Sequence, residues 1–277
     1  IRPENGQVAP HTSRDAAPCP PELIEFAGRL ADAAGEVIRQ YFRQPFDIIT
    51  KADESPVTIA DRQSERVMRD LIEATYPDHG IMGEEHGTVR GNAEYVWYLD
   101  PIDGTKSFIS GVPLFGTLIG LAQKDGDIHR PWMGVIDQAI SGERWMGAPG
   151  HGTTFNGQPA HVRSCPSVSD AIMFTTSPEY FEGERLSQYQ RVEDTAHMTR
   201  YGTDCYAFAI LSSGHIDLIV EAGLNEYDYC AVVPVIENAG GIVTDWSGRA
   251  KTLDGENTIV AAGDVATHAE TLRILAG

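Results

Sequence analysis

A six-residue stretch, Asp100-Pro101-Ile102-Asp103-Gly104-Thr105, restricts the possible folds of this chain more than any other feature. It directly follows Tyr95–Leu99, an aromatic and β-branched run that is typical of a buried strand. Pro101 fixes its own φ and has no N–H to donate, and Gly104 permits a sharp turn. The pattern predicts a strand that delivers carboxylates to its C-terminal end, where open α/β sheets tend to bind ligands.

The two aspartates of this stretch have two interpretations. In such a turn both carboxylates can converge on one side, with the Ile102 carbonyl between them, which offers the hard oxygen ligands that Mg²⁺ or Mn²⁺ takes. The amides of Gly104 and Thr105 then open the next segment, where free N–H groups can hold a phosphate. Asp-Pro and Asp-Gly are also common turn dipeptides, so an ordinary Asp-rich turn stays open from these residues alone.

Three further acidic positions are ambiguous when each is considered separately. The pair Glu84-Glu85 follows the apolar residues Ile81 and Met82 and can sit at a strand end, although adjacent acids are usually a solvated loop. Asp61 and Asp228 each stand at the expected start of a helix. First-turn acids are favoured there by the helix dipole, with or without a ligand.

The composition excludes several classes of partner. The 277 residues include 40 Asp and Glu against 21 Lys and Arg, a formal charge of −19. Because nucleic acids and anionic membranes are bound by clustered Lys and Arg, we expect neither as a partner. No apolar run approaches the roughly 18 residues of a membrane span. The four cysteines form no C-x-x-C pair, which argues against structural zinc and a disulfide framework and indicates a cytoplasmic location.

Hydrophobic periodicity and turn residues predict the remaining elements and a stack of α and β layers. Residues 1–20 are expected to form a flexible extension. Residues 21–277 are expected to form a single domain of two closely packed halves, about 21–165 and 166–277. Helices are predicted over 21–43, 58–75, 179–192, 206–212, 228–238 and 267–275. Strands are predicted over 95–99, 117–122, 133–140, 171–175, 216–220, 241–245 and around 259.

Taken together, the acidic segments resemble the inositol monophosphatase superfamily of Mg²⁺-dependent, lithium-sensitive phosphatases over residues 21–277. The resemblance implies a mixed α/β fold, a layered αβαβα sandwich of the inositol monophosphatase and fructose-1,6-bisphosphatase type. It also implies a homodimer that hydrolyses small phosphorylated metabolites. The segments that carry it are Gly83-Glu84-Glu85, Trp97 to Phe108 with its Asp-Pro-Ile-Asp-Gly-Thr core, Tyr227-Asp228, and Glu237 to Gly241.

The resemblance implies two to three Mg²⁺ ions, with Mn²⁺ as a possible substitute. Glu84 and Asp100, with the Ile102 carbonyl, match the ligands of the first ion. Asp100, Asp103 and Asp228 match those of the second, and Glu84 also helps to hold a weaker third.

The same resemblance implies the residues that act on water and substrate. Thr105 matches the residue that, with Asp61, orients or deprotonates the attacking water, and Glu84 belongs to this catalytic group. Lys51 matches a lysine near the outer metal, and Gly104 and Thr105 face the phosphate. Two cations are needed for this chemistry because a phosphate dianion repels hydroxide.

Several stretches look most like the histidinol-phosphate phosphatase group, namely Gly134–Gln138 with Glu143–Trp145, Asp204–Ala207 and Tyr227–Glu237. Ser107 and Tyr227 stand where inositol-type members have Asn and Trp. We therefore expect hydrolysis of L-histidinol phosphate to L-histidinol and phosphate, a step of histidine biosynthesis. Inositol-1-monophosphatase, and a broad-specificity or nucleotide 3′-phosphatase, remain alternatives within the superfamily. A non-catalytic, metal-dependent regulatory protein is the alternative from another class.

Asp204 and Glu221 match the substrate-facing wall of the family by position. Two carboxylates without an obvious basic neighbour suit a cationic leaving group, such as an amino alcohol that bears imidazole. The alternatives are that Asp204 caps the helix that begins near Tyr206 and that Glu221 is a surface residue.

Overall fold

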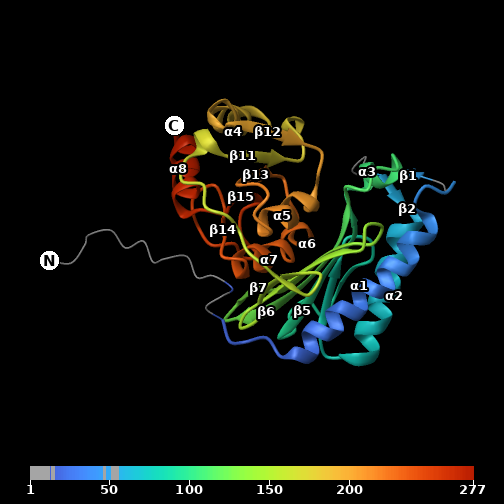
Figure 1. Cartoon of the computed structure of the whole chain (residues 1–277). Coiled ribbons are helices and arrows are strands. Elements are labelled where there is room, and N and C mark those ends of the chain that lie inside the picture. Colours follow the sequence, from blue (N-terminus) through green and yellow to red (C-terminus); the bar gives the residue numbers. More distant parts are fainter. Residues whose placement is uncertain (1–12, 14–15, 46–47, 51–55) are drawn as a thin grey trace.

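Two mixed β-sheets alternate with three layers of helices in the computed structural model of the chain (Figure 1). The structure describes residues 13, 16–45, 48–50 and 56–277. The α-helices are α1 (Pro21–Tyr41), α2 (Ile59–Thr75), α3 (Thr105–Ile109), α4 (Gly183–Thr195), α5 (Cys205–Ser212), α6 (Glu226–Tyr229), α7 (Val232–Asn238) and α8 (Val265–Ala276), and η2 (Val168–Asp170) and η3 (Pro178–Tyr180) are 3₁₀ turns.

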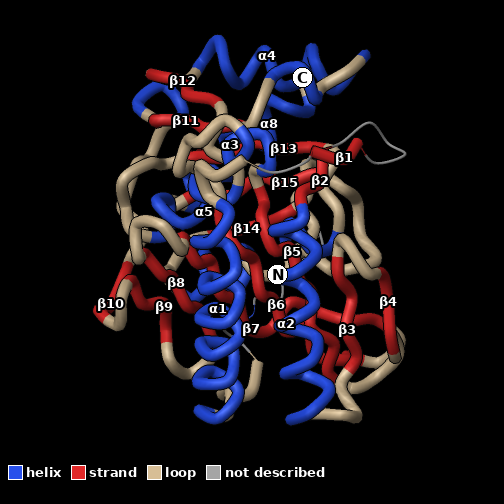
Figure 2. Tube along the Cα trace, turned by 90° about the vertical axis from the view of Figure 1, so that its right-hand side faces the viewer, coloured by secondary structure: helices blue, strands red, loops and turns tan. Residues whose placement is uncertain are grey.

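The larger sheet has the order β10-β9-β8-β7-β6-β5-β3-β4. Its strands are β3 (Gly80–Gly83), β4 (Gly87–Val89), β5 (Tyr95–Asp103), β6 (Gly116–Asp125), β7 (Ile128–Gln138), β8 (Glu143–Ala148), β9 (Gly152–Phe155) and β10 (Gln158–Ala160). A separate pair, β1 (Ile48–Thr50) and β2 (Pro56–Thr58), precedes α2. Figure 2 shows α1 and α2 side by side across one face of the larger sheet.

The smaller sheet has the order β12-β11-β13-β15-β14. Its strands are β11 (Ile172–Thr175), β12 (Met198–Tyr201), β13 (Leu218–Ala222), β14 (Ile242–Thr244) and β15 (Thr258–Ala262). Helices α5, α6 and α7 lie between the two sheets, and α8, with α4 packed on it, covers the outer face of the smaller sheet. The order of layers is therefore α, β, α, β, α, which confirms the expected mixed α/β sandwich.

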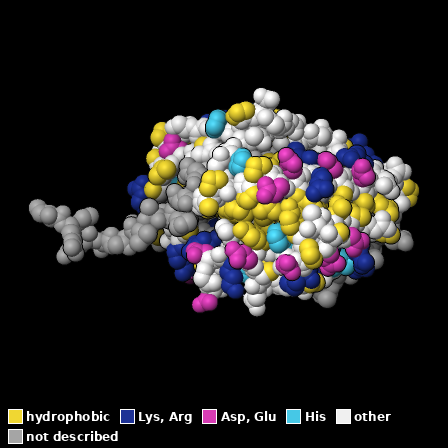
Figure 3. All heavy atoms as spheres, turned by 90° about the horizontal axis from the view of Figure 1, so that it is seen from below, with side chains coloured by type: hydrophobic (Ala, Val, Ile, Leu, Met, Phe, Trp, Pro, Cys, Tyr) yellow, Lys and Arg dark blue, Asp and Glu magenta, His cyan; other side chains and the backbone are white. Residues whose placement is uncertain are grey.

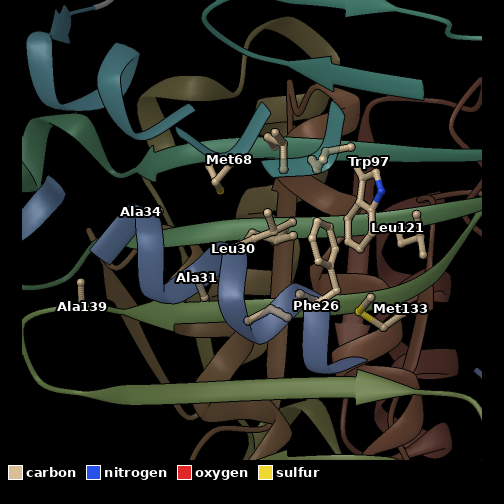
Figure 4. Packing of buried hydrophobic residues seen from close by; sticks show 14 of the residues in the cluster. Phe26, Leu30, Ala31, Ala34, Met68, Trp97, Leu121, Met133 and Ala139 are labelled. Atoms are coloured by element: carbon tan, nitrogen blue, oxygen red, sulfur yellow. The ribbon is translucent and has the colours of Figure 1, made fainter. Parts of the chain in front are cut away.

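The first apolar core lies between α1, α2 and the larger sheet. Phe26, Leu30 and Ala34 recur on one face of α1 at four-residue spacing, and all three are buried. Figure 4 shows Phe26 facing Trp97 of β5 and Met133 of β7, with Leu30 and Ala34 further along the helix. Burying such side chains contributes about 1.5–3 kcal/mol each, so this layer holds β5, the strand that carries the aspartates, firmly against the helices.

Two predicted helices differ from the observed ones. The helix expected over 179–192 is a 3₁₀ turn, η3, followed by α4 at 183–195, because Phe181 and Glu182 between them have extended backbones. The helix expected over 228–238 is broken into α6 and α7. Pro234 supplies no N–H for the Cys230 carbonyl four residues earlier, so the helix is interrupted there. The edge strand β12 was not predicted.

Part of the expected N-terminal extension contacts the rest of the chain. The Ser13 N–H donates to Glu237 Oε2 (2.6 Å), and Cys19, which is buried, donates its N–H to the Pro149 carbonyl (2.9 Å). Seen from below (Figure 3), acidic and basic side chains are intermixed around a band of hydrophobic ones, so the net acidity is not concentrated on this face. Among the helices of the described residues, none is long and apolar enough to cross a membrane.

Candidate active site

A bulge at the end of β5 places Asp100 and Asp103 on the same face of the sheet. Asp100 pairs with Leu118 and Asp103 with Gly116 of β6, so three steps along β5 correspond to two along β6. Residues three apart in a regular strand point to opposite faces. The one extra residue of the bulge cancels this difference, so both carboxylates turn toward the layer of helices between the sheets.

Asp228 reaches this point from α6. Its Oδ2 accepts a hydrogen bond from the Asn225 N–H (2.7 Å), in a capping box that fixes the side chain at the start of the helix. Asp100 is fixed in a similar way, because its Oδ1 accepts from the Ile102 N–H (3.1 Å). One carboxylate oxygen from each of Asp100, Asp103 and Asp228 lies within 4.8 Å of the other two. Two sheet residues and one helix residue therefore form a single acidic cluster.

The cluster is electrostatically unfavourable by itself. Burial, and after it the neighbouring carboxylates, raise the pKa values of Asp100 and Asp103 well above their ordinary range. Burial raises the pKa of Asp228 to about 7, against the opposing effect of its capping hydrogen bonds. A divalent cation would remove this penalty, and a set of carboxylate oxygens is the donor set that Mg²⁺ and Mn²⁺ prefer. The residues present therefore fit such an ion.

Glu84 joins the cluster through parallel strand pairing. Strand β3 runs parallel to β5 with Gly83 opposite Leu99, so the next residue on each strand is an acid, Glu84 beside Asp100. The Glu84 N–H donates to the Leu99 carbonyl (3.1 Å), which continues the ladder by one residue. The charge of Glu84 contributes to the raised pKa of Asp100.

Glu65 on α2 holds the loop that carries Glu84, and the sequence interpretation missed it. Its side chain is fully buried and accepts from the N–H groups of Glu85 (2.7 Å) and His86 (3.1 Å). Arg69 Nε donates to the same carboxylate (2.6 Å), so the buried charge is paired. A side chain at Gly83 would overlap Glu65. An acid on the apolar face of a predicted helix, four residues before an arginine, was the available signal.

Asp61 lies close enough to Glu84 for the charge of Glu84 to contribute to the raised pKa of Asp61. Its Oδ2 accepts from the N–H (2.8 Å) and the hydroxyl (2.5 Å) of Thr58 at the start of α2. Its Oδ1 is buried and has no hydrogen-bond partner among the described residues. Burial is the main reason that the pKa of Asp61 rises to about 6. The Thr105 hydroxyl donates to the Ile102 carbonyl (3.2 Å). The carbonyl that is predicted to bind metal and the hydroxyl that is predicted to orient water therefore lie on one short turn.

Asp204 does not cap α5 with its side chain, so that alternative is wrong. The first N–H of the helix, that of Cys205, donates to Asp103 Oδ2 instead (2.5 Å). Asp204 has φ +46, and its carboxylate lies over Gly104, where a Cβ would be 3.0 Å from Oδ2. The Ser107 hydroxyl donates to Asp204 at 3.4 Å, and burial raises the pKa of Asp204 to about 6 against the opposing charge of Lys106. The expectation that Asp204 has no basic neighbour is therefore wrong.

Glu221 on β13 is not a surface residue. It is buried, and its Oε1 accepts from the N–H (2.5 Å) and hydroxyl (2.9 Å) of Thr176. Burial raises its pKa to about 7. A cavity of about 340 Å³ joins these acids to the carboxylate cluster. Its walls are made by Glu84, Asp103, Gly104, Thr105, Lys106, Thr176, Tyr180, Asp204, Glu221, Ala222, Gly223, Leu224 and Asp228.

The family model described as the inositol monophosphatase family matches residues 20–276. The chain belongs to the inositol monophosphatase family. This match spans both sheets and every acid of the cavity, and the family is Mg²⁺-dependent in general, with which a carboxylate cluster that could hold a metal ion agrees.

The chain is similar to phosphatases of known sequence and of known structure. The chain is 49% identical to the bifunctional phosphatase IMPL2, chloroplastic, of Arabidopsis thaliana, over 92% of this chain and 76% of the relative. It is 34% identical to a histidinol-phosphatase of Chlorobaculum parvum, over 86% of this chain and 91% of that one. A solved inositol monophosphatase from Zymomonas mobilis is 44% identical with a TM-score of 0.84, covering 93% of this chain and 98% of the other.

Most of the site residues expected in this inositol monophosphatase family member meet at one place. The cavity and the buried cluster behind it bring together Glu84, Asp100, Asp103, Asp228, Gly104, Thr105, Asp204 and Glu221. Ile102 and Asp61 are buried beside them. Lys51 lies outside the described residues.

Proposed function

We propose that this phosphatase hydrolyses L-histidinol phosphate to L-histidinol and phosphate. The observation that carries the proposal is the second pair of acids, Asp204 and Glu221, on the cavity wall beside the carboxylate cluster. A cyclitol or sugar needs neutral hydroxyl partners, whereas an ammonium or imidazolium group is stabilised by carboxylates. The relatives named histidinol-phosphatase support the same substrate.

The residues of the chain supply the positioning around the bound ions. Glu84, Asp100, Asp103 and Asp228, with the Ile102 carbonyl, would hold two to three Mg²⁺ ions. When bound, Mg²⁺ neutralises the ester and lowers the pKa of water.

Asp61 is suited to accept the proton of the attacking water. Thr58 holds its Oδ2, so the buried Oδ1 stays available, and a pKa of about 6 is close to the working pH of a general base. Thr105 donates its proton to the Ile102 carbonyl, which leaves lone pairs of its hydroxyl oxygen to receive a hydrogen bond from the same water. The water oxygen then bonds to phosphorus, the ester P–O bond breaks, and the alcohol oxygen takes up a proton.

The oligomeric state and location are further parts of the proposal. We expect a homodimer, as the family resemblance implies. A cytoplasmic location agrees with the absence of a C-x-x-C pair, although the Arabidopsis relative is named as chloroplastic.

The test is a comparison of phosphate esters with the purified chain in Mg²⁺. L-Histidinol phosphate, myo-inositol 1-phosphate and adenosine 3′,5′-bisphosphate are offered separately, and kcat/KM is measured for each by phosphate release. We expect kcat/KM to be at least about 10-fold higher for histidinol phosphate than for the other two esters, because one charge-assisted hydrogen bond contributes a factor of that size. Efficient turnover of only the inositol ester would overturn the proposed substrate but leave the assignment of phosphatase activity intact. Magnesium binding without turnover of any ester would instead favour a regulatory protein.

A further inference from the structure

An aromatic side chain, Tyr180, stands at the cavity and takes no part in the chemistry described above. It ends the 3₁₀ turn η3, which follows β11 of the smaller sheet, and it is 48% exposed. Lys106, from α3 after β5 of the larger sheet, donates from Nζ to the Tyr180 hydroxyl (3.0 Å). Both side chains line the cavity, so they meet across it from segments that follow different sheets.

The segment that carries Tyr180 is fixed at its base by the substrate wall. Thr176 is bound by Glu221 through its N–H and hydroxyl, and Pro178 restricts the backbone two residues later. The Ser177 hydroxyl accepts from the Glu179 N–H (3.3 Å) and closes the turn. An exposed phenol ring is thus held at a defined place beside the acids instead of swinging freely.

We propose that Tyr180, positioned by Lys106, is the face against which a planar ring of the leaving group stacks. This rests on the proposed function, because it adds a ring site to the carboxylates that receive the cationic groups. A phenol ring attracts a flat ring by offset stacking and an imidazolium by its electron-rich face. Lys106 Nζ contacts the hydroxyl and lies over one face of the Tyr180 ring, 5.3 Å from its centroid, so the leaving-group ring is expected on the opposite face. Asp204 and Glu179 lie close enough to offset the charge of Lys106.

The test compares two esters that share the amine and differ in the ring: L-histidinol phosphate and 2-aminopropyl phosphate. The measured quantity is the ratio of their kcat/KM values, which does not depend on the fraction of folded enzyme. For Tyr180→Ala we expect this ratio to fall roughly 3- to 10-fold, mostly through KM, which is the range of one aromatic contact. Tyr180→Phe keeps the ring but removes the hydroxyl that Lys106 holds, and Lys106→Met removes the other partner of the same hydrogen bond, so each should lower the ratio only in part and by less than Tyr180→Ala.

Tyr201→Ala is the matched control, since Tyr201 is equally exposed on β12 but does not line the cavity. An unchanged ratio in Tyr180→Ala, or an equal fall in Tyr201→Ala, would overturn the proposal. If the wild-type enzyme ignores histidinol phosphate, 2-phenylethyl phosphate and propyl phosphate give the same ring comparison. If the wild type prefers 2-phenylethyl phosphate and Tyr180→Ala removes that preference, the ring site is supported even though histidinol phosphate is not the substrate.

Discussion

Asp204 shows how one strained residue can decide which ester binds. A non-glycine residue at φ +46 costs roughly 1–3 kcal/mol, and such strain persists where the surroundings enforce it. Here the side chain does not cap α5 in return, because Asp103 takes that position. The strained conformation places the carboxylate over Gly104, on the wall of the cavity.

Replacement of this carboxylate should therefore change specificity more than activity. In Asp204→Asn the side chain keeps its size and loses its charge. We expect kcat/KM for histidinol phosphate to fall roughly 10- to 100-fold, the worth of a charged hydrogen bond, with a much smaller loss for myo-inositol 1-phosphate. Ser107→Ala, which removes only the 3.4 Å hydrogen bond to Asp204, serves as the control. Equal losses on both esters in Asp204→Asn would show that Asp204 is structural.

At the scale of elements, α2 is linked to the carboxylate cluster through the buried side chain of Glu65. Glu65 binds the backbone of the loop after β3, and that loop carries Glu84. The helix thus sets the position of Glu84, a proposed metal ligand to which it is not adjacent in sequence. Outer residues that orient metal ligands typically contribute 10- to 100-fold in metal affinity.

Glu65→Gln should weaken Mg²⁺ binding while the fold is retained. An amide can accept fewer of the three N–H groups that now point at the carboxylate. We expect the Mg²⁺ concentration for half-maximal activity to rise roughly 10-fold or more, with kcat largely recovered at saturating Mg²⁺. Asp70→Asn on the same helix, where the acid forms an exposed pair with Arg66, is the control and should leave the Mg²⁺ requirement unchanged. A normal Mg²⁺ requirement in Glu65→Gln would contradict the linkage.

The sequence predicts a helix or strand boundary where the interactions that form it join residues close together in sequence. The start of α2 follows from Thr58 and Asp61 three residues apart, and both take part in its capping box. The convergence of Asp100 and Asp103 depends on the β5–β6 register, which spacing alone does not encode. The roles of Glu65 and of the backbone at Asp204 depend on contacts between segments distant in sequence. These features required the folded chain.

At the scale of the whole molecule, the excess of acids has a local consequence. A part of the net charge of −19 is gathered at one buried place, where Asp228 and Glu221 have pKa values near 7. Without metal, the folded chain binds more protons than the unfolded chain between about pH 4 and pH 7, because the folded pKa values are raised. Stability is therefore greatest at the acidic end of this window and falls as the pH rises through 7.

Magnesium should reverse this pH dependence. We expect the Tm in EDTA to fall between pH 5 and pH 8, and Mg²⁺ to raise it far more at pH 8 than at pH 5. At 100 times its Kd, a ligand adds about 2.7 kcal/mol, which corresponds to roughly 5–10 °C for a chain of this size. Calorimetry in matched buffers gives both values. The same Mg²⁺ shift at both pH values would show that the carboxylates are not the ligands.

The most direct measurement is the turnover of L-histidinol phosphate as a function of Mg²⁺ concentration, in the wild type and in Asp228→Asn. Glu226→Gln, an acid-to-amide change two residues away on α6, is the control. We expect EDTA to abolish turnover and Mg²⁺ to restore it. Asp228→Asn should lose at least about 100-fold in kcat/KM, because the ion that this carboxylate would hold neutralises the ester, and that neutralisation contributes several kcal/mol. Turnover that survives EDTA, or wild-type activity in Asp228→Asn, would contradict the metal-dependent site.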